Sequence, residues 1–156
     1  MAKQQPQDNI VCRNRKATFR FEILEEVECG ILLQGTEVKS LRDRNATLEE
    51  AYARIDGNEV WLIGFHISPY KYGHSQNHEP TRKRKLLLRS EQIRKLKPKV
   101  EQRGQTLVPL RVYFSDRGIA KVAVALCKGK TVGDKRQSLK ARDDRREMDR
   151  AMRRKG

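Results

Sequence analysis

Several features are scarce or missing in this chain of 156 residues, and each absence argues against a class of protein. No apolar run approaches the roughly 18 residues that a membrane-spanning helix needs. The first residues, MAKQQPQDN, lack the apolar core of a secretory signal. The three cysteines, Cys12, Cys29 and Cys127, are odd in number and far apart, which is typical of reduced thiols rather than of a disulfide framework. We therefore expect a cytoplasmic protein with no membrane association.

Motifs that carry catalysis or hold a cofactor are also missing. The sequence has no G-x-S-x-G turn and no glycine-rich loop that would cradle phosphates. His74 and His78 are spaced like metal ligands, but no cysteine pair accompanies them, so we expect no metal and no cofactor. Glu49 and Glu50 lack a partner that would tune a pKa for acid–base catalysis. These absences favour a binding protein over an enzyme, and a nuclease without a recognisable motif is the alternative.

Positive charge is what the sequence has in excess. It carries 35 Lys and Arg against 20 Asp and Glu, a net charge of +15. Such an excess favours polyanionic partners, most often nucleic acid and sometimes an anionic membrane surface. Each basic cluster taken alone fits a solvated surface equally well, but several on one small domain favour contacts to phosphates. The clusters are Arg13, Arg15 and Lys16, then Lys39 and Arg42, then Arg82, Lys83, Arg84 and Lys85.

Apolar periodicity is confined almost entirely to residues 16–128. From Phe19 to Leu33 the apolar residues occupy odd positions, which predicts a long strand with one buried face, and only Glu25 breaks the pattern. Gly30 inside this strand predicts a bend or a close backbone approach. Further alternating runs predict two hairpins. These runs cover residues 51–55, 61–67, 108–114 and 122–126.

Two helices are expected between these strands. Thr36 is predicted to cap the first helix, with Val38 and Leu41 facing inward. Ser90 is predicted to cap the second, which Pro98 would kink or end early. The order strand, helix, strand, strand, helix, strand, strand favours a mainly β fold, an OB-type closed antiparallel barrel over residues 16–128. A mixed α+β sandwich is the alternative, and residues 1–15 are expected to be a flexible N-terminus.

Residues 129–156 form a basic C-terminal tail. Between Lys128 and Lys155 there are 12 Lys or Arg against 5 Asp or Glu, a net charge of +7. Arg142, Arg146 and Arg150 recur every fourth residue, which stacks like charges on one helical face. Because the tail offers little apolar area to offset the entropy of ordering, we expect it to be disordered when free. RNA phosphates would neutralise the arginines and allow a helix to form on binding.

Five segments of the sequence together resemble one known family. They are NRKATFRFEI, ECGILLQGTEVKSLR, PTRKRKLLL, GQTLVPLRVYF and CKGKTVGDKR. From about Asn14 to the C-terminus the chain resembles small protein B, the SsrA-binding proteins, which are bacterial partners of transfer-messenger RNA. The resemblance implies binding to the tRNA-like domain of that RNA and delivery, with elongation factor Tu acting through the charged RNA, to stalled ribosomes. It also implies that the protein stands in the decoding region while its tail probes the empty message channel, so that the nascent chain is tagged and the ribosome rescued.

The resemblance also assigns residues to an RNA face and to a ribosome-contacting tail. Glu28 would accept hydrogen bonds from base edges or ribose, and the alternative is an ion pair with a neighbouring Arg or Lys. The RNA face comprises Asn14, Lys16, Glu28, Lys39, Arg42, Arg84, Lys85 and Leu86, to which the basic clusters add Arg15, Arg82 and Lys83. The tail contacts are Lys128, Gly129, Lys130, Asp134, Lys135, Arg136, Lys140, Arg142, Arg146 and Arg150.

Two positions of the tail depart from the family pattern. Thr131 stands where the family commonly has a lysine, and Gly133 stands where a histidine or tyrosine commonly precedes the DKR sequence. A ring that stacks or hydrogen-bonds is therefore missing before Asp134, and Arg136 or the backbone would have to compensate for it. We expect the protein to be a monomer.

Overall fold

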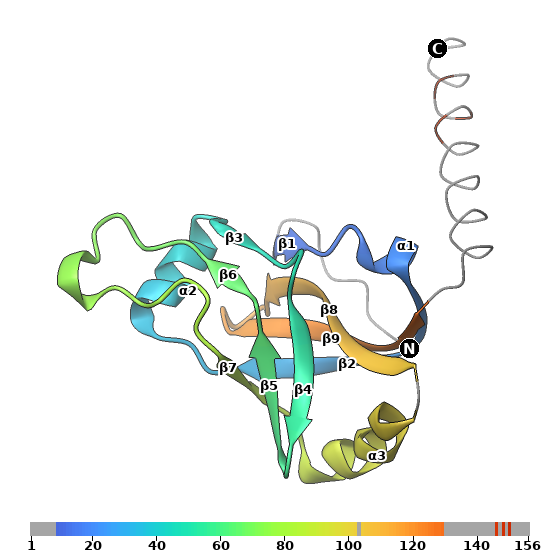
Figure 1. The fold of residues 1–156 in the computed structure, drawn as a ribbon. Coiled ribbons are helices and arrows are strands. Elements are labelled where there is room, and N and C mark those ends of the chain that lie inside the picture. The colour runs from blue at the N-terminus through green and yellow to red at the C-terminus, as the bar shows by residue number, and fades with distance from the viewer. Residues whose placement is uncertain (1–8, 103, 130–145, 147, 149, 151–156) are drawn as a thin grey trace.

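A computed structural model describes residues 9–102, 104–129, 146, 148 and 150 of the chain (Figure 1). Six strands form a closed antiparallel barrel in which each pairs with its neighbours and the last returns to the first. Around the barrel they are β8 (Gln105–Phe114), β4 (Tyr52–Asp56), β5 (Glu59–Ile63), β7 (Arg84–Leu87), β2 (Phe21–Ile31) and β9 (Ala120–Gly129). The predicted mainly β class and closed antiparallel barrel are confirmed, with six strands in place of five.

Three short strands complete the β structure of the described residues. β1 (Ile10–Arg13) pairs with Arg111–Tyr113 of β8, whereas β4 pairs with Leu107 farther down the same strand. β3 (Ala46–Thr47) and β6 (His66–Ile67) pair with each other outside the barrel. Within the predicted N-terminal segment, residues 10–13 form a strand, because this part of the β8 edge is open to a further strand.

The strand β2 explains the interrupted alternation seen in the sequence. Ile23 pairs with Cys127 and Glu25 with Leu126, so Leu24 is an extra residue that forms a bulge. Beyond the bulge Cys29 and Ile31 are buried, as the odd-position pattern predicts. A Cβ atom at Gly30 would lie 3.2 Å from the Cβ of Leu87, which confirms the close approach expected there.

In one strand the sequence pattern predicts the wrong set of buried residues. In β5 the buried residues are Val60 and Leu62, whereas Trp61 and Ile63 are only half-buried. Gly64 has a positive φ of 79° and ends β5, so Phe65 and Ile67 are buried after a change of chain direction rather than along one strand. A period-two pattern read across Gly64 therefore joins two segments.

Three α-helices lie in the described residues up to 129. They are α1 (Ala17–Arg20), α2 (Gly35–Arg42) and α3 (Ser90–Glu101), so Phe19 belongs to a helix and not to the predicted first strand. The cap of α2 is Gln34 rather than Thr36, in a capping box with Glu37, and the cap of α3 is Arg89 rather than Ser90. Pro98 does not end α3 early, because the helix continues to Glu101.

One main apolar core fills the barrel, and two small clusters lie outside it. β9 is buried on both faces from Val122 to Cys127, because Ile10 and Ala17 from β1 and α1 cover its outer face through contacts around Ala123 and Cys127. In Figure 1, α2 and the connection between β6 and β7 lie at the left of the barrel, and α3 lies at its lower right. No helix among the described residues is long and apolar enough to cross a membrane.

Candidate nucleic-acid interface

The helix α2 presents Lys39 and Arg42 to solvent on one side, as the sequence predicts. The Nζ of Lys39 lies 5.4 Å from the centre of the Tyr70 ring, and the guanidinium carbon of Arg42 lies 5.0 Å from the centre of the Phe114 ring. Each cation therefore packs over an aromatic ring that restricts its side chain. Both remain exposed and able to contact a phosphate.

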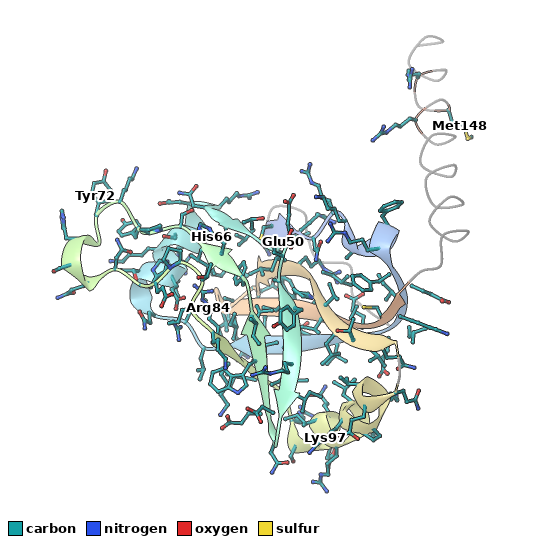
Figure 2. All side chains as sticks on the ribbon, in the orientation of Figure 1. Glu50, His66, Tyr72, Arg84, Lys97 and Met148 are labelled. Carbon is teal, nitrogen blue, oxygen red and sulfur yellow. The ribbon has the colours of Figure 1, made fainter. Side chains whose placement is uncertain are left out.

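Behind this basic surface lies a buried ion-pair network. The side chain of Arg84, labelled in Figure 2, is fully buried like that of Glu37, and its Nε donates to Glu37 Oε2. Arg82, which is 31% exposed, donates from Nη2 to Glu37 Oε1 over 2.5 Å. The other two nitrogens of Arg84 donate to the carbonyl oxygens of Phe65, over 2.5 Å, and of Pro80, over 3.0 Å. The network thus ties α2 to β7 and to two loops.

The protonation state of Glu37 follows from these contacts. Burial raises the pKa of the Glu37 carboxyl, but hydrogen bonds from Arg82, from the backbone N–H of Gln34 and from Arg84 outweigh it, so that the pKa lies below its ordinary value. Burial lowers the pKa of Arg84, and the pairing with Glu37 opposes that shift. The carboxylate is therefore charged at neutral pH. It lies in the first turn of α2, where the helix dipole favours negative charge.

The sequence RKRKLL around β7 divides between the interior and the surface. Arg84 and Leu86 share one parity and point inward, with Leu86 only 2% exposed. Lys83 is exposed, with its Nζ 5.6 Å from the centre of the Trp61 ring, and Lys85 is half-buried beside Glu59. The exposed leucine of this run is Leu87, at 45% exposure, and not Leu86, which the resemblance assigns to the RNA face. Direct RNA contact by Arg84 and Leu86 disagrees with their burial.

The segment between β1 and α1 carries the predicted residues Asn14, Arg15 and Lys16. Asn14 is buried, with its backbone N–H donating to Leu110 O over 2.7 Å and its Nδ2 donating to Pro109 O over 3.1 Å. These bonds fix the segment against β8. Arg15 and Lys16 beside it are exposed and available to phosphates.

Glu28 is exposed on β2, where acidic neighbours form ion pairs. Glu25 accepts from Lys99 over 2.9 Å, and Glu26 accepts from Arg111. Burial raises the pKa of Tyr113, and a hydrogen bond with Glu28 raises it further. The hydroxyl of Tyr113 on β8 therefore lies close enough to Glu28 to interact with it.

The strand β8 connects three of the predicted groups. Asn14 bonds to Pro109 and Leu110, Glu28 to Tyr113, and Arg42 packs over Phe114, which are all residues of β8. Residues spread from position 14 to position 42 are thus held against one strand. The structure gives these groups a shared rigid support.

The beginning and one short part of the predicted tail are described. Lys128 and Gly129 are exposed at the end of β9, paired with Glu22 and Phe21 of β2. Arg146, Met148 and Arg150 have helical backbone and exposed side chains. The other predicted tail residues, Lys130, Asp134, Lys135, Arg136, Lys140 and Arg142, lie outside the described residues, as do Thr131 and Gly133.

His78 and the three cysteines lie in structural surroundings, whereas His74 is exposed. His78 is buried, with Nδ1 2.9 Å from Thr36 Oγ1 and Nε2 2.9 Å from Ile67 O. Within the described ranges, no three His, Cys, Asp or Glu side chains gather as a metal site would require. Burial raises the pKa of Cys12 and of Cys29 to about 12 and that of Cys127 to about 11, which keeps these thiols protonated.

Comparison with known proteins agrees with this architecture. The sequence profile of the SmpB protein family matches residues 11–154. An SsrA-binding protein of Trichodesmium erythraeum is 53% identical over 154 residues, covering 97% of this chain and 98% of its own. One from Nostoc is 54% identical over 144 residues, covering 92% of each chain.

A solved structure shows the same likeness in three dimensions. The structure described as "tmRNA-SmpB: a journey to the center of the bacterial ribosome" contains a chain that is 45% identical to this one. The two superpose with a TM-score of 0.68 over 82% of this chain and 93% of the other. With a profile match over nearly the whole length and relatives at about half identity, this chain belongs to the SmpB family of SsrA-binding proteins.

Proposed function

We propose that this protein binds transfer-messenger RNA and acts in trans-translation as a binding protein and not as an enzyme. The observation that carries the proposal is the nearly full-length match to SsrA-binding proteins together with a solved tmRNA–SmpB relative. The basic side chains of α2 and of the β1–α1 segment, both fixed to β8, supply the phosphate contacts that such binding requires.

The RNA-binding surface is built from exposed residues on these supports. Lys39 and Arg42 on α2, with Arg15 and Lys16, contact phosphates. Glu28 and the exposed Leu87 lie on the paired strands β2 and β7 and contact bases or ribose. Asn14 and Arg84 hold these groups in position from below.

The finer steps of the function extend the same proposal. The protein delivers the RNA to stalled ribosomes, with elongation factor Tu acting through the charged RNA, and occupies the decoding region as a cytoplasmic monomer. Its C-terminal tail, residues 129–156, contacts ribosomal RNA phosphates and lies as a helix in the message channel only when no message fills it. The helical backbone at Arg146, Met148 and Arg150 is consistent with this geometry.

The first test compares two RNAs of equal size, the tRNA-like domain and an ordinary tRNA. Affinities are measured across a salt series for the full chain and for a chain ending at Lys128. We expect a strong preference for the tRNA-like domain that persists without the tail. Equal affinity for both RNAs, lost steadily with salt, would instead mark a general RNA chaperone.

A second test separates the tail from the barrel. Deletion of residues 137–156 should leave binding to the tRNA-like domain unchanged and abolish tagging of nascent chains on stalled ribosomes. The matched measurement uses full-length protein in the same translation reaction. A truncated protein that still supports tagging would contradict the role proposed for the tail.

A further inference from the structure

The connection between β6 and β7 displays an aromatic side chain that no core contact explains. Figure 2 shows Tyr72 at the outer end of this connection, beyond α2, and its side chain is 65% exposed. The Tyr70 ring lies beside it in an edge arrangement, with ring centres 5.6 Å apart and planes at 73°. The Nζ of Lys71 lies 5.1 Å from the centre of the Tyr72 ring. We call residues 70–77 the tyrosine loop.

Hydrogen bonds of the loop itself hold the tyrosines in place. Asn77 accepts from the backbone N–H of Tyr70 over 2.9 Å and donates from Nδ2 to Tyr70 O over 2.7 Å. The N–H of Gly73 donates to Tyr70 O over 2.9 Å, and a Cβ at Gly73 would lie 2.7 Å from Asn77 Nδ2. Asn77 and Gly73 therefore fix the conformation of a loop that is exposed at its tip.

The base of the loop is anchored to the barrel and to α2. The buried His78 joins Thr36 of α2 to Ile67 of β6 through its two ring nitrogens. Lys39 of α2 packs over the Tyr70 ring, so the loop continues the basic surface of α2 without a break. An ordered, exposed ring that adjoins a row of cations matches what an unpaired nucleobase requires, namely a stacking partner with phosphate contacts on either side.

We propose that Tyr72 stacks on an unpaired base of the bound RNA, while Lys71 and Lys39 contact the phosphates that flank this base. The inference rests on the proposed function, because it assigns a further subsite to the same RNA. Tyr70 supports the Tyr72 ring from its edge and orients it. The occupant is RNA rather than a protein segment, because the cations packed on the two rings, Lys39 and Lys71, complement a polyanion.

The test measures binding of the tRNA-like domain to four proteins across a salt series. Tyr72→Ala should weaken binding about tenfold without changing the salt slope, since stacking releases no counterions. Tyr72→Phe should keep wild-type affinity, because the ring remains. Tyr52→Ala is the matched control, a tyrosine that is 44% exposed on β4, and it should bind as the wild type does.

A spectroscopic readout makes the stacking itself visible. Tyr72→Trp adds a second tryptophan to the native Trp61. Addition of the tRNA-like domain should quench the tryptophan fluorescence of this variant more than that of the wild type. Wild-type affinity and salt slope in Tyr72→Ala, with no added quenching in Tyr72→Trp, would overturn the inference and favour a protein partner for the loop. If the wild type itself fails to prefer the tRNA-like domain, the proposed function fails, which is a separate outcome.

Discussion

The helices α2 and α3 are both short, basic and amphipathic, yet the barrel holds them by different forces. α3 packs the apolar side chains of Ile93 and Leu96 against the barrel, and the contact is non-directional. α2 packs Leu41 but also buries the carboxylate of Glu37, which receives directed hydrogen bonds from Arg84 and Arg82. Apolar burial keeps a helix near the barrel, whereas the buried ion pair also fixes where its exposed cations point.

The largest effect should come from removing the buried cation beneath α2. Arg84→Met leaves Arg82 as the remaining cation paired with Glu37 and removes the side-chain donor to the carbonyl of Phe65, while the carbonyl of Pro80 keeps the N–H of Ile67. The free energy of unfolding should fall by about 3–5 kcal/mol, as measured by urea denaturation. Arg82→Met, at a partly exposed position, should cost less. Equal losses in the two variants would contradict the distinction drawn here.

The second prediction compares the exposed cations of the two helices. Arg42→Ala should weaken binding to the tRNA-like domain several-fold and reduce the salt slope by about 1, because one phosphate contact is lost. Lys97→Ala is the matched control on α3, at the bottom of the barrel in Figure 2. It should leave both the affinity and the salt slope unchanged. Equal weakening by both would show that net charge alone determines the affinity.

The third prediction concerns the stability of the folded protein at acid pH. Because the pKa of Glu37 is held below its ordinary value of 4.5, its charged form stabilises the folded protein above that pH, and this stabilisation is lost as the pH falls through the folded pKa. The stability gap between wild type and Glu37→Gln should therefore narrow below about pH 4.5. The stabilities of the two proteins are measured by denaturation at each pH. A difference between them that stays constant through the acid range would contradict this prediction.

The smallest effect should come from the ion pair beside α3. Lys99→Met breaks the contact with Glu25, in which both side chains are nearly half exposed. The expected change in the free energy of unfolding is below about 1 kcal/mol, because water screens the pair. A loss as large as that of Arg84→Met would show that α3, too, depends on directed charge contacts.

The sequence predicts the barrel because period-two burial is strong wherever one face meets the core. It does not predict β1, since four residues carry too little pattern, nor the bulge at Leu24, since a single unmatched position does not show which residue is extra. The basic run around β7 reads as uniformly exposed, but strand parity places Arg84 inside. The only signal for that burial is its shared parity with Leu86, and it becomes informative once the strand itself is located.

The tyrosine loop shows a different limit of pattern reading. Its residues lack periodicity and read as a polar loop, so the sequence gives no indication that Asn77 closes it or that His78 anchors it. The contact of His78 depends on Thr36 of α2, more than 30 residues earlier in the chain, whereas Asn77 bonds to the nearby backbone of Tyr70. Charge and spacing predict that Lys39 and Arg42 are exposed, but they give no indication of how the rings are arranged.

The closure of the barrel also sets an order of events during synthesis. β9 is the last strand of the barrel along the chain, and it pairs along its length with both β2 and β8. A growing chain that ends before Ala120 leaves the edges of β2 and β8 open, and such edges are prone to pair with other chains. The RNA-binding body is therefore completed only after almost the whole barrel sequence has been made, and its long-range strand pairs make its folding slow relative to that of a helical domain of equal size.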